Sequence, residues 1–147
     1  MDIVSLLPSH IVFERGMDGP AVIGACTQLT SATVGFTAEN FRQNRAFVEL
    51  LHEVIGTRGP LVAGLQEAAR QHGDGAGWIS AFDARTRIGG ENPSTEDLIG
   101  QFAIEDGAVV PGSYKSNPDY RLLSARGWFR LDPEFRDELM KRLTGEP

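Results

Sequence analysis

The clearest pattern along the chain is a change in the spacing of apolar residues near residue 74. Before this point, apolar side chains recur every three or four positions, which is the spacing of one face of an α-helix. After it, they occur in short runs separated by glycine and polar residues, as in strands joined by turns. The sequence therefore predicts helices in the first half and a sheet in the second.

Three helices are predicted in the first half. The first spans 20–33, although Gly24 lowers its helix propensity. The second has Thr37 as its expected N-cap. Its apolar side follows the i, i+3, i+4, i+7, i+8 pattern and consists of Phe47, Leu50, Leu51, Val54 and Ile55. The third spans 61–73 and ends at Gly73, a residue type that commonly follows the last turn of a helix.

A β-hairpin is the strongest signal in the second half. Asp106-Gly107 lies between the apolar segments 99–105 and 108–111, and this dipeptide favours a two-residue type I′ turn. Proline has no backbone N–H to donate to a neighbouring strand, so the hairpin should reach a sheet edge or a strand end at Pro111. The expected register pairs Glu105 with Ala108, Ile104 with Val109, and Phe102 with Pro111.

Further strands are predicted at 78–82 and 128–131, and a last helix begins at Asp132-Pro133-Glu134. That helix ends at Gly145. Its inward-facing residues are Phe135, Leu139, Met140 and Leu143. The fold class is therefore α+β, with three N-terminal helices, a mostly antiparallel sheet of three to five strands including the hairpin at 99–111, and a C-terminal helix.

Length and charge narrow the choice of partners. A chain of 147 residues suits a single domain over 1–147. The 14 Lys and Arg residues against 20 Asp and Glu residues give a net charge of −6, and no segment is a basic run. This composition argues against binding to nucleic acid or to an anionic membrane surface. The first residues lack the pattern of a secretory signal, so a cytoplasmic protein is expected.

Several familiar kinds of site are not supported by the sequence. Cys26 lies on the apolar side of the first predicted helix, where a free cysteine behaves as a small hydrophobic residue. His10, His52 and His72 are far apart in the sequence and lack metal-ligand spacing, so neither a metal nor a cofactor is expected. We expect His52 to be exposed and His72 to cap or pack at a helix end. The glycines of 73–77 follow a helix and precede a strand, the reverse of the order in a dinucleotide-binding loop.

The segment 111–121 is the most promising candidate for a binding site. It places hydroxyl, phenol and cationic groups between two apolar segments, and loops on a rigid sheet often carry binding groups. The candidate ligand-binding residues are Ser113, Tyr114, Lys115, Tyr120 and Arg121. The guanidinium group of Arg121 can bind a carboxylate through two parallel hydrogen bonds. A structural turn, in which Asn117 and Asp119 bond their own backbone, is the competing interpretation.

The last third of the chain carries a resemblance to other proteins. The residues that carry it are Asp97-Leu98-Ile99-Gly100, Asp106-Gly107, Pro111-Gly112-Ser113-Tyr114, Asn117-Pro118, Arg121-Leu122-Leu123, Gly127 and Leu131. In these the chain resembles a group of small uncharacterised bacterial proteins of the kind carried by mobile gene cassettes. The group has no assigned activity, so the resemblance implies no catalytic residue.

Three functional hypotheses follow. The leading one is a non-enzymatic accessory or small-ligand-binding protein that forms a homodimer through an open sheet edge near Trp78, Trp128 and Phe129. The second is a small cofactor-independent hydrolase or isomerase with a pocket in a cone-shaped α+β fold. It would use a carboxylate such as Asp83 or Asp97 close to the 111–121 segment. The third is an interaction protein with an acidic surface.

Overall fold

The computed structural model describes residues 2–5, 22–26, 41–87, 95–124 and 127–144. Its helices are α2 (Arg45–Arg58), α3 (Ala63–His72) and α4 (Pro133–Thr144), with three 3-10 helices, η1 (Gly59–Leu61), η2 (Ala84–Arg87) and η3 (Thr95–Asp97). Its strands are β1 (Asp2–Ser5), β2 (Val22–Cys26), β3 (Phe41–Gln43), β4 (Ala76–Phe82), β5 (Leu98–Glu105), β6 (Ala108–Val109), β7 (Lys115–Ser116), β8 (Leu123–Ser124) and β9 (Gly127–Trp128). Every pairing between these strands is antiparallel.

The first predicted helix is wrong. Within 20–33 the structure describes β2, which is the central strand of a three-stranded sheet between β1 and β3. Cys26 is therefore the last residue of a strand, and not part of a helix. A Cβ atom on Gly24 would lie 2.3 Å from the carbonyl oxygen of Arg42, so β3 approaches β2 where glycine leaves room. Pairing on both sides of β2 overrides a weak helical pattern that already contained an unfavourable glycine.

The second predicted helix forms as α2, but its start differs from the prediction. Asn44 is the N-cap, and its side-chain oxygen accepts a hydrogen bond from the N–H of Ala46 at 3.2 Å. The same residue ties the helix to β2, because its backbone N–H and its side-chain amide donate to the carbonyls of Ile23 and Val22. The expected N-cap, Thr37, lies outside the described residues. The helix therefore begins at Arg45, later than an N-cap at Thr37 would place it.

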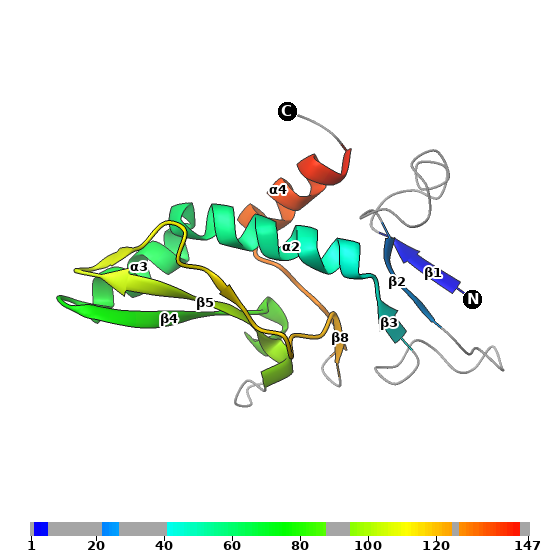
Figure 1. The fold of residues 1–147 in the computed structure, drawn as a ribbon, viewed down its shortest axis with the longest axis horizontal. Coiled ribbons are helices and arrows are strands. Elements are labelled where there is room, and N and C mark those ends of the chain that lie inside the picture. Colours follow the sequence, from blue (N-terminus) through cyan, green and yellow to red (C-terminus); the bar gives the residue numbers. More distant parts are fainter. Residues whose placement is uncertain (1, 6–21, 27–40, 88–94, 125–126, 145–147) are drawn as a thin grey trace.

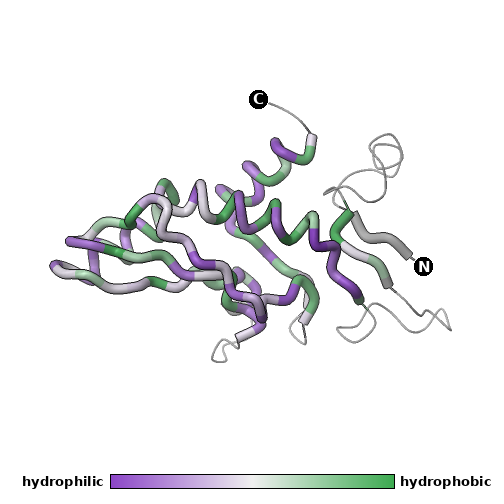
Figure 2. Tube along the Cα trace, in the orientation of Figure 1, coloured by the Kyte–Doolittle hydropathy of each residue, from purple (hydrophilic) through white to green (hydrophobic). Residues whose placement is uncertain are grey.

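The core of the molecule forms around α2. Its predicted apolar side is buried at Phe47, Leu51, Val54 and Ile55, and in Figure 2 its tube changes between hydrophobic and hydrophilic within each turn. In Figure 1, α2 runs along the β4–β5 sheet, and α4 lies against the side of α2 that is turned away from this sheet. The predicted third and last helices are confirmed as α3 and α4. The described part of the chain thus has three α-helices, and two of them precede β4.

The predicted hairpin is confirmed in its turn and in its first two pairs. Asp106 and Gly107 have φ values of 51° and 80°, as a type I′ turn requires, and Glu105 pairs with Ala108 and Ile104 with Val109. The third expected pair is wrong, because the chain leaves β5 after β6 and Pro111 lies in a second turn. It returns to β5 as β7, where Lys115 pairs with Gln101. Pro111 is therefore beyond a strand end, as its missing N–H predicted.

The main sheet has the order β4–β5–β6, with β7 beside β6 along the same side of β5. The predicted last strand is reduced to β9, which pairs with β8 as a separate two-stranded sheet. The α+β class and the antiparallel sheet are therefore confirmed, whereas the arrangement of three N-terminal helices is not. None of the helices in the described ranges is long and apolar enough to span a membrane.

Candidate functional site

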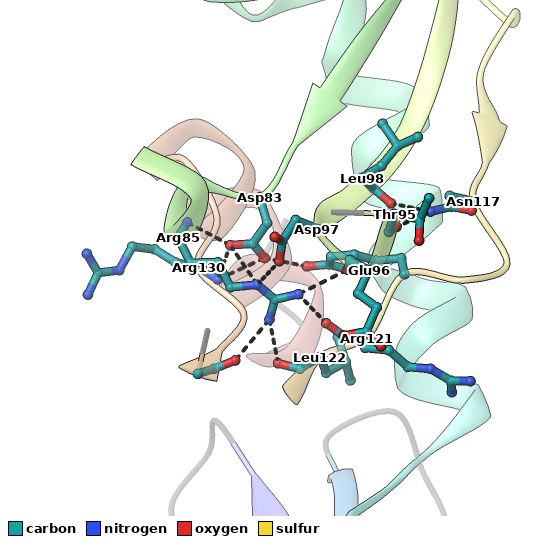
Figure 3. Close-up of polar contacts among 12 residues, drawn as sticks. Asp83, Arg85, Thr95, Glu96, Asp97, Leu98, Asn117, Arg121, Leu122 and Arg130 are labelled. Carbon is teal, nitrogen blue, oxygen red and sulfur yellow. Dashed lines mark hydrogen bonds and ion pairs between the residues drawn. The ribbon is translucent and has the colours of Figure 1, made fainter. Parts of the chain in front are cut away.

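A buried network of charged groups lies where β4 ends. Asp83 directly follows β4, Arg85 belongs to η2, and Asp97 ends η3 (Figure 3). Both carboxylates have no exposed surface, and the Arg85 side chain is 2% exposed. Arg85 Nε lies 2.8 Å from Asp97 Oδ1 and 3.8 Å from Asp83 Oδ1. Because buried charges are costly unless they are paired and hydrogen-bonded, this arrangement depends on the partners of each atom.

Arg85 uses all five of its N–H groups. Nε–H donates to Asp97, and the four remaining N–H groups donate to backbone carbonyls. Nη1 donates to Leu122 and Gly127, each at 3.1 Å. Nη2 donates to Glu96 at 3.1 Å and to Arg121 at 2.6 Å. One guanidinium group therefore fastens η3 and the segment around β8 and β9 to the end of β4.

Asp83 completes the network from the other side. Its Oδ1 accepts hydrogen bonds from the backbone N–H of Arg85 and of Arg130, both at 2.9 Å. Its Oδ2 accepts one from the phenol of Tyr120 at 2.6 Å. Burial and the neighbouring carboxylate raise the pKa of Tyr120 well above its usual range, so the phenol stays protonated and keeps donating.

The network acts as a structural clamp, because its hydrogen bonds join segments that are far apart along the chain. Asp83 and Asp97 lie near Tyr120 and the backbone of Arg121, which is where the hydrolase or isomerase hypothesis placed a carboxylate. However, both acids are fully buried, so no substrate can reach them. Among the described residues, no group of three or more His, Cys, Asp and Glu side chains is placed to hold a metal ion.

A second polar contact joins α2 to the sheet. His52 Nδ1 and the Tyr114 hydroxyl are 2.6 Å apart, and this hydroxyl also lies 3.3 Å from the carbonyl oxygen of Ile99. The ring of Tyr120 lies 6.2 Å from that of His52, edge to face. Burial lowers the pKa of His52 and raises that of Tyr114. The expectation that His52 is exposed is wrong, because Tyr114 covers it from the sheet side.

His72, by contrast, ends α3 and lies against Gly77, where a Cβ atom would be 2.8 Å from its Nε2. His72 therefore lies at the helix end as predicted, next to Gly77, and its side chain is exposed.

Ser113 supports the excursion between β6 and β7. Val110, Pro111, Gly112 and Ser113 form a turn in which Gly112 has a φ of 79° and the Ser113 N–H donates to the Val110 carbonyl. The Ser113 hydroxyl accepts from the N–H of Ala103 and donates to Val110, so it replaces a missing strand partner. This candidate residue therefore has a structural role.

Lys115 lies on the opposite face of the sheet from α2. Its ammonium group is 5.0 Å from the centre of the Trp78 ring, and Trp78 is 49% exposed. Within the described residues, no helix covers this face beside Trp78. Tyr114 and Tyr120 meet around His52, but Lys115 and Arg121 each lie elsewhere, so the five candidates do not form one site.

Arg121 lines a surface cavity of about 260 Å³. Its other described lining residues are Phe41, Gln43, Glu96 and Leu123. The guanidinium group points away from the buried network in Figure 3, and in the described part of the chain no hydrogen bond or ion pair occupies it. Phe41 forms the apolar wall and is held by Trp128, edge to face at 5.0 Å. The predicted candidate Arg121 thus reaches a cavity with its charge available.

No pattern in the sequence pointed to the other lining residues of this cavity. Phe41 and Gln43 belong to β3, more than 70 positions before Arg121 along the chain, and β3 lay inside a predicted helical region. Glu96 lies in a short acidic stretch of the sequence that resembles an ordinary solvated surface segment. A local sign did exist for Arg85, since it lies two residues after Asp83 at the end of an apolar strand, but such a pair also occurs on exposed turns.

Comparisons with known proteins give no further guidance. No protein-family model, curated protein or solved structure matches this chain. The resemblance of its last third to small bacterial proteins therefore stays a prediction.

Proposed function

We propose that this protein is a non-enzymatic binding protein for a small molecule with a carboxylate group, held in the cavity beside Arg121. The observation that carries the proposal is an exposed guanidinium group without a partner among the described residues, on the wall of a cavity of about 260 Å³. The guanidinium fork matches a carboxylate with two parallel hydrogen bonds. Phe41 and Leu123 supply an apolar wall, as small-ligand sites usually have.

The cavity supports binding better than catalysis. Glu96 is the one carboxylate among its described lining residues, and it is exposed to water. General acids and bases act best where water is excluded. The acidic-surface hypothesis receives less support, because exposed helix carboxylates such as Glu49 and Glu67 pair with arginines of their own helices.

Nuclear magnetic resonance titration with 4-methylpentanoate tests the proposal. We expect saturable shifts of backbone amides around β3, η3 and β8, and a loss of affinity of at least about tenfold in Arg121→Gln. Arg130→Gln is the matched control, because Arg130 is also exposed but enters the network through its backbone. An absence of saturable shifts, or equal affinity in Arg121→Gln and the wild type, would refute the proposal.

We also propose that the protein forms a homodimer through β4, the edge strand of the main sheet. The Asp106 N–H donates to the Gly75 carbonyl, which shows that the backbone N–H and C=O groups of the odd-numbered residues in β4 point toward β5. The backbone groups of the alternate residues point outward, and these residues are Ala76, Trp78, Ser80 and Phe82. Neither a charged residue nor a proline protects this edge. Phe129 packs on Phe47, whereas Trp128 contacts Phe41 and is still 37% exposed.

Light scattering after size-exclusion chromatography tests the homodimer. A dimer gives twice the monomer mass of 16.0 kDa. Ser80→Pro removes an outward N–H without breaking the β4–β5 ladder, so it should yield monomers, whereas Ser80→Ala should not. A monomeric wild type would end this part of the proposal and leave ligand binding unaffected.

A further inference from the structure

The cavity beside Arg121 carries two opposite charges that do not neutralise each other. The backbone N–H of Arg121 donates to the carbonyl of Glu96 at 3.1 Å, so the two residues are neighbours in space. Both side chains are exposed and both line the cavity. Nevertheless, no ion pair joins the Arg121 guanidinium and the Glu96 carboxylate among the described contacts. Each charge is therefore available to a ligand that carries the opposite charge.

Both charged residues stand on a fixed backbone. Nη2 of the buried Arg85 donates to the carbonyls of Glu96 and Arg121, so one group holds the two backbones at once. A third lining residue, Gln43, is fixed by its Oε1, which accepts from the N–H of Leu122 at 2.6 Å and leaves its amide N–H₂ as a donor. Binding groups on a rigid support lose less conformational entropy when a ligand arrives. The clamp described above therefore also positions this cavity.

The size and the walls of the cavity limit the ligand further. A volume of about 260 Å³ holds about nine waters at the density of the liquid, which leaves room for a free amino acid of the size of leucine. Phe41 and Leu123 are 8% and 7% exposed and offer apolar contact to a hydrocarbon side chain. Cation and anion are thus on the wall of a cavity that also has an apolar side.

We infer that the ligand is a zwitterion of the amino-acid class. Its carboxylate binds the guanidinium of Arg121, its ammonium group binds the carboxylate of Glu96, and an apolar side chain lies against Phe41 and Leu123. This inference rests on the proposed function and adds the second charge and the apolar side chain to it.

Isothermal titration of the full chain with three probes tests the inference. Leucine carries both charges, 4-methylpentanoate carries the carboxylate alone, and 3-methylbutylamine carries the ammonium group alone. We expect leucine to bind at least about tenfold more tightly than either of the other two. In Glu96→Gln, leucine should fall to the affinity of 4-methylpentanoate, whose own affinity should not change. Arg130→Gln should leave all three affinities unchanged.

The possible results separate this inference from the proposed function. If 4-methylpentanoate binds as tightly as leucine, or if Glu96→Gln does not weaken leucine, the zwitterion is refuted and carboxylate binding stands. If 3-methylbutylamine alone binds, or if none of the three probes binds, both proposals are refuted. Circular dichroism shows whether the Glu96→Gln protein is folded. If it is folded and binds neither leucine nor 4-methylpentanoate, the inference is also refuted.

Discussion

Replacing Arg85 with methionine tests whether the buried network holds the second half of the molecule together. The substitution keeps much of the side-chain volume and removes all five N–H donors. Four backbone carbonyls lose a hydrogen bond, and Asp97 loses the cation at 2.8 Å. Removing one partner of a buried ion pair costs about 3–5 kcal/mol, chiefly because a charge stays buried without compensation.

Urea denaturation measures this cost. We expect the free energy of unfolding of Arg85→Met to fall by about 4 kcal/mol, which shifts the midpoint by about 2 M if the urea slope is about 2 kcal/mol/M. Arg130→Met is the matched control, because its backbone N–H continues to bind Asp83, and it should change stability by less than about 0.5 kcal/mol. Arg85→Lys keeps the charge and has three donors, so it should lie between the two.

A double substitution identifies the cause. In Arg85→Met with Asp97→Asn, the carboxylate is neutralised together with its partner, so the combined loss should be smaller than the sum of the two single losses by at least about 1 kcal/mol. The reasoning is refuted if Arg85→Met costs less than about 1 kcal/mol, or if the two losses simply add. Either result would mean that the network contributes little beyond filling space.

Four further predictions concern other parts of the fold. Tyr120→Phe should lower the free energy of unfolding by about 2 kcal/mol in urea, because a buried carboxylate loses a donor at 2.6 Å; an unchanged midpoint would contradict this. Gly100→Ala should lower the free energy of unfolding by about 3 kcal/mol, since the new Cβ would lie 2.5 Å from a backbone oxygen. Gly112→Ala should lower it by only about 1 kcal/mol, because the space beside Gly112 is open and only its φ of 79° is unfavourable for alanine. Equal losses in the two variants would contradict this reasoning. The lowered pKa of His52 means that the unfolded chain binds a proton more readily, so stability should fall as the pH drops below 6.5, and His52→Gln should remove that part of the pH dependence of thermal unfolding. The raised pKa of Tyr114 should produce a loss of stability above pH 10, which Tyr114→Phe should lessen.

Elements with strong local signals were predicted well. The second and third helices, the Asp106-Gly107 turn and the start of the last helix each depend on residues within one or two turns of one another. The prediction was wrong at β2, where a weak helical pattern lost to pairing with strands on both sides. The prediction was also wrong at the third pair of the hairpin. Pro111 belongs to a turn over residues 110–113 that moves the chain away from β5, so it does not pair with Phe102.

The candidate site shows a similar division. The 111–121 segment was rightly singled out as polar and partly exposed, and Arg121 does line a cavity. However, Tyr114 and Tyr120 bind His52 and Asp83 inside the molecule, and Ser113 completes a turn. A polar side chain in a loop has the same appearance in a sequence whether it faces solvent or a buried partner.

The sequence by itself determined the Asp106-Gly107 turn, the end of α3 before Gly73 and the start of α4 at Pro133, because caps, glycines and prolines act between residues close along the chain. The tertiary structure alone decided which charges became buried and which face a cavity. Arg85 is enclosed because carbonyls from residues 96, 121, 122 and 127 converge on it, and Arg121 faces Gln43 because β3 comes to lie beside β8. These outcomes depend on segments that are distant along the chain, and hydrogen bonds between such segments leave no spacing pattern to be read.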